Sequence, residues 1–136
     1  MKVTADADIL FSALLRKGET RRIWFYPEID IYAPKSLLEE FKKYTPYLKN
    51  KFAGDEKDFL IITEKLISQV SFIEDAELEP FLPAAASLSN DPKDWFYIAC
   101  ALRENTAIWS NDKHFRTQGR IKTMTTQEMM KNFGRL

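Results

Sequence analysis

The chain has 136 residues, 45% of them apolar and 29% charged, which is typical of a soluble globular protein long enough to bury a core of its own. Its 20 basic and 20 acidic residues cancel, so the net charge gives no argument for a nucleic-acid partner. A single cysteine, Cys100, excludes an intrachain disulfide and a thiolate-rich metal site.

Two kinds of segment are missing from the sequence, and this sets the expected location. No stretch approaches the roughly 18 apolar residues that a membrane-spanning helix needs. The early acids Asp6 and Asp8 do not fit a signal peptide. We therefore expect a cytoplasmic protein without a membrane partner, folded as one domain over residues 1–136.

The hydrophobic pattern predicts strands that alternate with helices. In chain order the elements are a strand at residues 2–5, helices at 9–17 and 21–26, a strand at 29–33, helices at 36–47 and 55–69, a strand at 70–73, a loop with one helical turn at 74–89, a helix at 92–105, strands at 107–110 and 121–124, and a helix at 126–133. Pro46 is expected to end or kink the helix in which it lies. The alternation indicates an α/β sandwich with a mostly parallel central sheet.

Two acids follow strands directly. Asp6 comes after the first predicted strand, and Asp112 comes just after the fourth. In a parallel sheet, ligands bind where the carboxyl ends of the strands meet. We therefore expect both carboxylates at that edge of the sheet.

Two further acids interrupt the apolar faces of predicted helices. Asp94 lies in the first turn of its helix and shares a face with Ile98. Glu40 lies at the margin of the apolar stripe of the preceding long helix, whereas Glu39 points to solvent. An acid on an apolar face is costly to bury unless it is paired, hydrogen-bonded or bound to a metal.

Each of these acids also has an ordinary structural interpretation. Asp94 could complete a capping box in which Asp91 is the N-cap, and Asp112 could shape a turn. Asp6 and Asp8 could cap the first helix, and the glutamate could be a partly solvated helix residue. One shared site accounts for all four positions at once, and this is the interpretation that we favour.

Four carboxylates without a cluster of histidine or cysteine favour Mg²⁺ or Mn²⁺ over zinc, because these ions prefer oxygen ligands. Such ions activate water and stabilise in-line displacement at phosphorus. His114 is the only histidine and lies beside the expected site in sequence. We interpret it as a turn or surface residue.

Four motifs resemble those of the PIN domain family, which includes the VapC toxins of toxin–antitoxin pairs. They are Thr4-Ala-Asp-Ala-Asp-Ile-Leu-Phe-Ser-Ala-Leu, Pro34-Lys-Ser-Leu-Leu-Glu-Glu-Phe, Asp91-Pro-Lys-Asp-Trp-Phe-Tyr-Ile-Ala-Cys-Ala-Leu and Ile108-Trp-Ser-Asn-Asp-Lys-His-Phe. Each motif is short, but their order and spacing together are fairly specific, and the resemblance covers nearly the whole chain. One departure is the proline-bearing segment at residues 74–89, which is longer than compact toxins of the family often have.

The resemblance implies a three-layer α/β/α sandwich and a metal-dependent endoribonuclease that binds one or two divalent ions, Mg²⁺ or Mn²⁺. It implies RNA as the substrate, a homodimer, and an antitoxin protein that holds the enzyme inactive. Ser110 stands where the family carries Thr or Ser before the last acid, and Asp8 stands where it usually has Asn. The residues implied as the acidic cluster are Asp6, Glu40, Asp94 and Asp112.

Basic residues would hold the RNA backbone during hydrolysis of a phosphodiester bond. Contacts of this kind position the substrate and carry no sequence preference. The candidates are Arg16, Lys17, Arg21, Arg22, Lys113 and Arg116.

Two other functions remain open. A PIN-like module that binds RNA or supports assembly without turnover would have no need of four acids kept together. A haloacid-dehalogenase-like phosphatase is suggested by Asp6 and Asp8 after the first strand, but it would need Thr or Gly soon after the second acid. The residues Ile9-Leu10-Phe11 supply neither.

Overall fold

The structure is a computed structural model that describes residues 1–133. Its strands are β1 (Lys2–Ala5), β2 (Asp30–Pro34), β3 (Val70–Ile73), β4 (Ala107–Trp109) and β5 (Thr123–Met124). Its helices are α1 (Ala7–Leu15), α2 (Glu19–Trp24), α3 (Ser36–Lys51), α4 (Glu56–Ser68), α5 (Asp75–Leu78), α6 (Leu82–Leu88), α7 (Pro92–Glu104) and α8 (Thr126–Asn132), with 3-10 turns η1 (Glu79–Phe81) and η2 (Lys113–Gln118).

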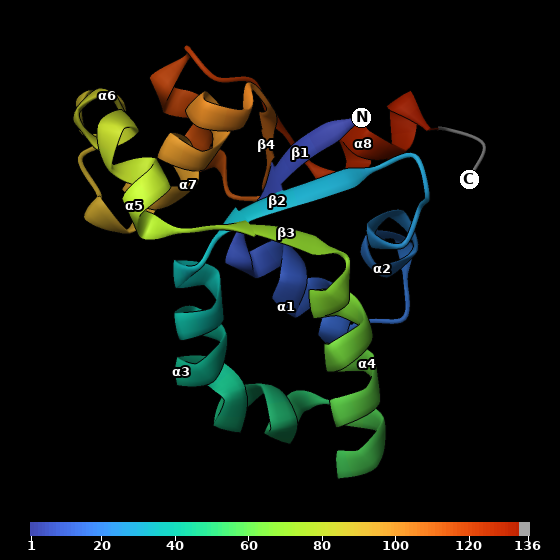
Figure 1. Cartoon of the computed structure of the whole chain (residues 1–136). Helices are drawn as coiled ribbons and strands as arrows, with labels where there is room; N and C mark the ends of the chain where they lie inside the picture. Colours follow the sequence, from blue (N-terminus) through green and yellow to red (C-terminus); the bar gives the residue numbers. More distant parts are fainter. Residues whose placement is uncertain (134–136) are drawn as a thin grey trace.

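The five strands form one sheet in the order β3-β2-β1-β4-β5, and every pairing is parallel. In the central strand, Val3 lies opposite Ile31 on one side and Ala107 on the other. Helices α1, α3 and α4 lie on one side of the sheet and α5, α6 and α7 on the other (Figure 1). The predicted α/β/α sandwich is therefore confirmed.

The strand order reverses direction between β1 and β4. The chain moves outward from β1 to β2 and β3, and then returns to place β4 on the opposite side of β1. Connections that leave two neighbouring strands in opposite directions open a crevice at the carboxyl ends of those strands. The segments that follow β1 and β4, where Asp6 and Asp112 lie, meet at this point.

Helix α3 continues past Pro46 and runs to Lys51, so the proline does not end the helix. Figure 1 shows that the helix changes direction in its lower part, as expected for a kink at proline. A proline inside a helix costs about 3 kcal/mol. Leu48, two residues later, is fully buried, and burial of such a side chain contributes roughly 1.5–3 kcal/mol, which offsets much of that cost.

The segment at residues 74–89 is more regular than the predicted loop with one helical turn. It folds as α5, η1 and α6, which pack against α7. Pro80 and Pro83 each lie in the first turn of their helix, where the missing N–H would have no partner anyway. Leu78 and Ala85 are fully buried, so this segment adds to the core.

Two tryptophans anchor the core, and both satisfy their indole N–H groups. Trp24 and Trp109 are fully buried with ring centroids 5.9 Å apart. Trp24 donates to the Leu66 carbonyl at 2.8 Å, and Trp109 donates to Thr126 Oγ1 at 3.1 Å. Among residues 1–133, none of the helices combines the length and the apolar character needed to span a bilayer.

Candidate metal centre at the carboxyl edge of the sheet

Asp6 occupies the point where β1 gives way to α1. Its backbone N–H donates to the Trp109 carbonyl at 3.1 Å, which extends the pairing with β4 by one residue. Its side chain is only 8% exposed and accepts a hydrogen bond from Ser110 Oγ at 2.8 Å. Ser110 also accepts from the Asp112 N–H at 3.0 Å, so this buried hydroxyl joins the two strand ends.

Burial raises the pKa of Asp6 to about 7, and the nearby negative charges of Asp8 and Glu40 act in the same direction. The hydrogen bond from Ser110 acts against this rise but does not cancel it. The surrounding protein thus offers the ionised form of Asp6 too few favourable interactions to balance the cost of its burial, and a bound cation would supply them.

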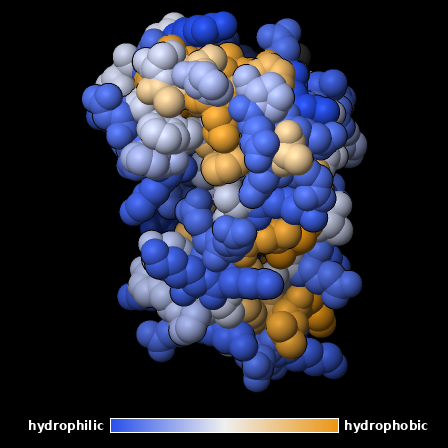
Figure 2. Space-filling view, turned by 60° about the vertical axis from the view of Figure 1, so that its left-hand side comes forward, coloured by the Kyte–Doolittle hydropathy of each residue, from blue (hydrophilic) through white to orange (hydrophobic). Residues whose placement is uncertain are grey.

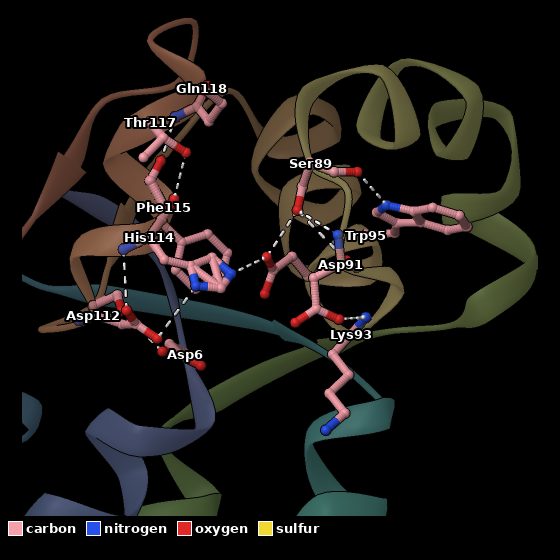
Figure 3. A network of polar contacts seen from close by, with 12 residues as sticks. Asp6, Ser89, Asp91, Lys93, Trp95, Asp112, His114, Phe115, Thr117 and Gln118 are labelled. Atoms are coloured by element: carbon pink, nitrogen blue, oxygen red, sulfur yellow. Dashed lines mark hydrogen bonds and ion pairs between the residues drawn. The ribbon is translucent and has the colours of Figure 1, made fainter.

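Asp94 reaches the same edge from the first turn of α7. It is 7% exposed, and its Oδ2 accepts from Ser89 Oγ at 2.9 Å and lies 2.6 Å from His114 Nε2. Burial raises its pKa, while the bond from Ser89 and the charge of His114 lower it. In Figure 3, His114 extends from the segment after β4 toward the start of α7, with Asp6 and Asp112 close to it.

Asp91 is the N-cap of α7, as predicted, because its carboxylate accepts from the Lys93 N–H at 3.0 Å. The capping-box interpretation of Asp94 is wrong. The backbone N–H of Asp91, which a box would direct to Asp94, donates instead to Ser89 Oγ at 3.1 Å. The Asp94 carboxylate therefore takes no part in capping the helix.

Glu40 is half-buried and Glu39 exposed, so the helical phase predicted from the sequence is confirmed. The Glu40 carboxylate accepts from the Tyr97 hydroxyl at 2.7 Å, which ties α3 to α7. Burial raises the pKa of Glu40, whereas the positive charges of Lys93 and Lys43 act in the opposite direction.

Asp8 and Asp112 are the more exposed acids of the group. Asp112 caps η2 by accepting from the His114 N–H at 3.0 Å, and its Oδ2 lies 3.8 Å from His114 Nδ1. Burial raises the pKa of Asp8, and the charge of Asp112 raises it further. Asp112 thus shapes a turn and also belongs to the acidic group.

The tightest group of possible metal-binding atoms comes from a different set of residues than the four expected acids, although Asp94 belongs to both. Within residues 1–133, the ligand atoms of Asp91, Asp94 and His114 lie within 4.8 Å of one another, and the four expected acids do not form such a set. Those acids lie near enough to alter one another's pKa, as the effects of Asp8 and Glu40 on Asp6 show. Carboxylate oxygens dominate both arrangements, and these are the ligands that Mg²⁺ and Mn²⁺ prefer.

Three polar side chains of the site were missed or undervalued in the sequence. Ser89 holds Asp94, Tyr97 holds Glu40, and His114 contacts both Asp94 and Asp112. Only Tyr97 carried a usable signal, since it lies three residues after Asp94 and so shares its helix face.

The expected RNA contacts divide between two places. Arg16 and Lys17 follow the end of α1, roughly 13–15 Å along the helix from Asp6 at 1.5 Å per residue. Arg21 donates to the carbonyls of Ala13 and Leu14 at 2.7 and 2.9 Å. Its guanidinium therefore caps α1, and its contact with RNA stays a prediction.

The remaining basic candidates also differ in their availability. Arg22 is an exposed residue of α2, on the same distant side as the end of α1. Lys113 and Arg116 lie in η2, next to Asp112. Arg116 forms an ion pair with Glu128, so Lys113 is the better placed of the two.

Comparison with known proteins supports this description of the fold. No curated protein matches the chain in sequence. A chain in the crystal structure of VapBC2 from Rickettsia felis, bound to a DNA fragment from their promoter, is 12% identical; the similarity covers 92% of this chain and 98% of that one, with a TM-score of 0.69. A chain of FitAcB from Neisseria gonorrhoeae is also 12% identical, over 93% and 99% of the two chains, with a TM-score of 0.62.

These two likenesses establish the fold, and the sequence match establishes the family. The model of the PIN domain matches residues 4–134, which is nearly the entire chain. The chain therefore belongs to the PIN domain family.

Proposed function

We propose that this chain is a cytoplasmic, metal-dependent endoribonuclease that hydrolyses RNA phosphodiester bonds. In this proposal Asp6, Glu40, Asp94 and Asp112 hold Mg²⁺ or Mn²⁺, with Ser110 and Asp8 in support. Membership of the PIN domain family supports the reaction class, and the placement of the acids at the switch point of the sheet supports the site.

One observation carries the proposal: two carboxylates are buried without a lysine or arginine partner. Asp6 and Asp94 are 8% and 7% exposed, and among residues 1–133 neither forms an ion pair with a lysine or arginine. Burial of an unpaired charge is strongly unfavourable. Both groups lie at the carboxyl edge of the sheet, where a bound cation would offset the cost of burying their charge.

A bound divalent cation would lower the pKa of water and offset charge on the phosphate during its displacement. The protein's own contribution is to hold the ligand oxygens in place. Ser110 fixes Asp6, Ser89 and His114 fix Asp94, and Tyr97 fixes Glu40. Such partners orient the ligands before the substrate binds, which reduces the reorganisation needed during the reaction.

The proposal extends to the toxin of a toxin–antitoxin pair. The motifs resemble those of VapC toxins, and the fold is similar to chains of VapBC2 and FitAcB. An antitoxin partner, a homodimer and a single domain over residues 1–136 are part of this proposal.

Asp94→Asn tests the site. This change keeps the size of the side chain and its ability to accept from Ser89, so we expect the fold to persist. Cleavage of a single-stranded RNA with Mg²⁺ or Mn²⁺ should fall by a factor of about 10²–10⁴, because loss of a metal ligand removes several kcal/mol of transition-state stabilisation. Unchanged cleavage by this variant would contradict the assignment.

Asp91→Asn is the matched control in the same turn of α7. Asparagine caps a helix as well as aspartate does, so stability should not change. Retained cleavage supports the four expected acids, whereas an equal loss assigns the metal to Asp91, Asp94 and His114. If saturating Mn²⁺ produced neither a thermal shift nor cleavage in the wild type, the chain would be a non-catalytic RNA-binding or assembly module.

A further inference from the structure

A groove of about 300 Å³ opens beside the acids, between the start of α3 and the first turn of α7. Glu40, one of the four expected acids, forms part of its wall, so the groove borders the candidate metal centre. The other residues that matter are Lys43 and Tyr44 from α3 and Lys93 and Phe96 from α7. This volume lies at the lower end of the roughly 300–1,000 Å³ range of ligand sites.

Tyr44 departs from the burial pattern of its own helix. It belongs by spacing to the apolar stripe of α3, in which Leu37 and Leu48 are fully buried, yet Tyr44 is 40% exposed. Its ring is held in place by an edge contact with Phe11, with centroids 5.7 Å apart and planes at 64°. The groove therefore displays an aromatic ring that rests against Phe11 and is partly exposed to solvent.

Two lysines bring positive charge to the side of the groove that holds this ring, while Glu39 and Glu40 line the groove as well. Lys43 and Lys93 are exposed, and Lys43 Nζ lies 5.5 Å from the centroid of the Tyr44 ring. Figure 2, which brings the α3 side of the molecule forward, shows that hydrophilic side chains dominate this face. An aromatic platform flanked by two ammonium groups suits a ligand that combines a flat ring with an anion.

We propose that this groove binds one unpaired nucleotide of an RNA strand next to the scissile phosphate. The base stacks on Tyr44, and the backbone phosphate lies between Lys43 and Lys93. Lys43 leaves the face of the ring when the base arrives, since an exposed cation–π contact is weaker than base stacking. A base in a duplex does not expose its face, so the groove selects single-stranded segments.

This inference rests on the proposed function, but it is tested by binding alone. The experiment uses the Asp6→Asn background with Mg²⁺, so that cleavage does not consume the probe. The probe is a fluorescein-labelled single-stranded oligoribonucleotide of mixed sequence, and binding is followed by fluorescence anisotropy. Stacking of one base contributes roughly 5- to 150-fold in affinity.

Tyr44→Leu should weaken binding by about tenfold while keeping the apolar bulk that packs on Phe11. Tyr44→Phe should bind like the parent, because the π-face remains. Tyr47→Ala is the matched control, since Tyr47 is 56% exposed, lies on the same helix and does not line the groove. Equal affinities for Tyr44→Leu and the parent, or an equal loss in Tyr47→Ala, would overturn the proposal.

A second measurement separates stacking from a change in the shape of α3. Each base of the oligonucleotide is replaced in turn by an abasic site. One position should weaken binding to the parent by about tenfold and leave binding to Tyr44→Leu unchanged. Penalties that are the same in both proteins would contradict stacking on Tyr44.

The outcomes distinguish this inference from the proposed function. If wild-type protein cleaves RNA and the Tyr44 variants bind normally, the function stands and the groove is left to a protein partner. If no cleavage occurs but Tyr44→Leu weakens RNA binding, the groove stands and the catalytic proposal falls.

Discussion

Two groups of buried polar side chains join β1 to its neighbours, and they differ in charge. Within β1, Thr4 Oγ1 lies 2.7 Å from Thr106 Oγ1 and 3.6 Å from Cys100 Sγ. Two residues later, Asp6 accepts from Ser110. The first group is neutral and satisfies its own hydroxyls. The second confines carboxylates near one another, and burial raises the pKa of Asp6 to about 7.

The two groups have opposite effects on the stability of the fold. A satisfied pair of hydroxyls in the core makes a modest net contribution to stability, whereas an acid kept ionised there reduces stability. Thr4 and Asp6 are both buried, so burial alone does not distinguish the two groups. The groups are distinguished by the charge of Asp6 and by its lack of a basic partner among the described residues.

Asp6→Asn should have the largest effect, and it should act in opposite directions on activity and stability. Cleavage of RNA with Mg²⁺ should fall by about 10²–10⁴-fold, because a ligand oxygen loses its charge. The metal-free variant should unfold at a higher urea concentration than the wild type at pH 8. Cleavage kinetics and urea unfolding in EDTA measure the two effects.

The pH dependence of that stability gain checks its cause. In the folded wild type the pKa of Asp6 is raised from 3.8 to about 7, so the folded state binds the proton more tightly than the unfolded state. The contribution of Asp6 to wild-type stability is therefore greatest below pH 4 and declines as the pH rises to about 7, by a few kcal/mol at most. The gain from Asp6→Asn should appear over the same interval. A gain that is equal at pH 4 and pH 8 would contradict this explanation.

Thr4→Val should produce the reverse result in the neutral group. The substitution removes one hydroxyl and leaves Thr106 Oγ1 buried without its partner, at a cost of about 1–3 kcal/mol. Cleavage per folded molecule should not change. A loss of activity larger than the loss of folded protein would show that the two groups are coupled.

His114→Ala should reduce activity less than Asp6→Asn or Asp94→Asn does. The imidazole orients Asp94 through the 2.6 Å contact at Nε2, and loss of such a partner reduces activity by about tenfold. Isothermal titration with Mn²⁺ should show a parallel decrease in affinity. A loss as large as that of Asp94→Asn would identify His114 as a ligand in its own right.

The sequence was sufficient for those parts of the site that depend on local geometry. Strand ends located Asp6 and Asp112, and helical phase distinguished Glu40 from Glu39 and placed Asp94 on a buried face. These inferences need only the period of the element and the direction of a parallel sheet. The assignment of these acids as metal ligands remains a prediction.

The partners of the acids could not be obtained in this way. Ser89 and His114 lie 5 and 20 residues from Asp94, in segments whose paths are set by tertiary packing. For the segment at residues 74–89 the sequence predicts mainly a loop, because two prolines usually interrupt regular structure. Here each proline occupies a first helical turn, and buried Leu78 and Ala85 hold the short helices against α7.

That segment ends at Ser89, and this gives its length a consequence. Ser89 binds Asp94 through its hydroxyl and receives the Trp95 indole N–H at 2.8 Å through its carbonyl. Inserting or deleting a residue between β3 and α7 would therefore shift a hydrogen-bond donor of the candidate centre along with the surface of the molecule. Relatives with a different length here would have to orient this aspartate through other contacts. Grafting the segment from one relative to another would therefore transfer the residues that make those contacts.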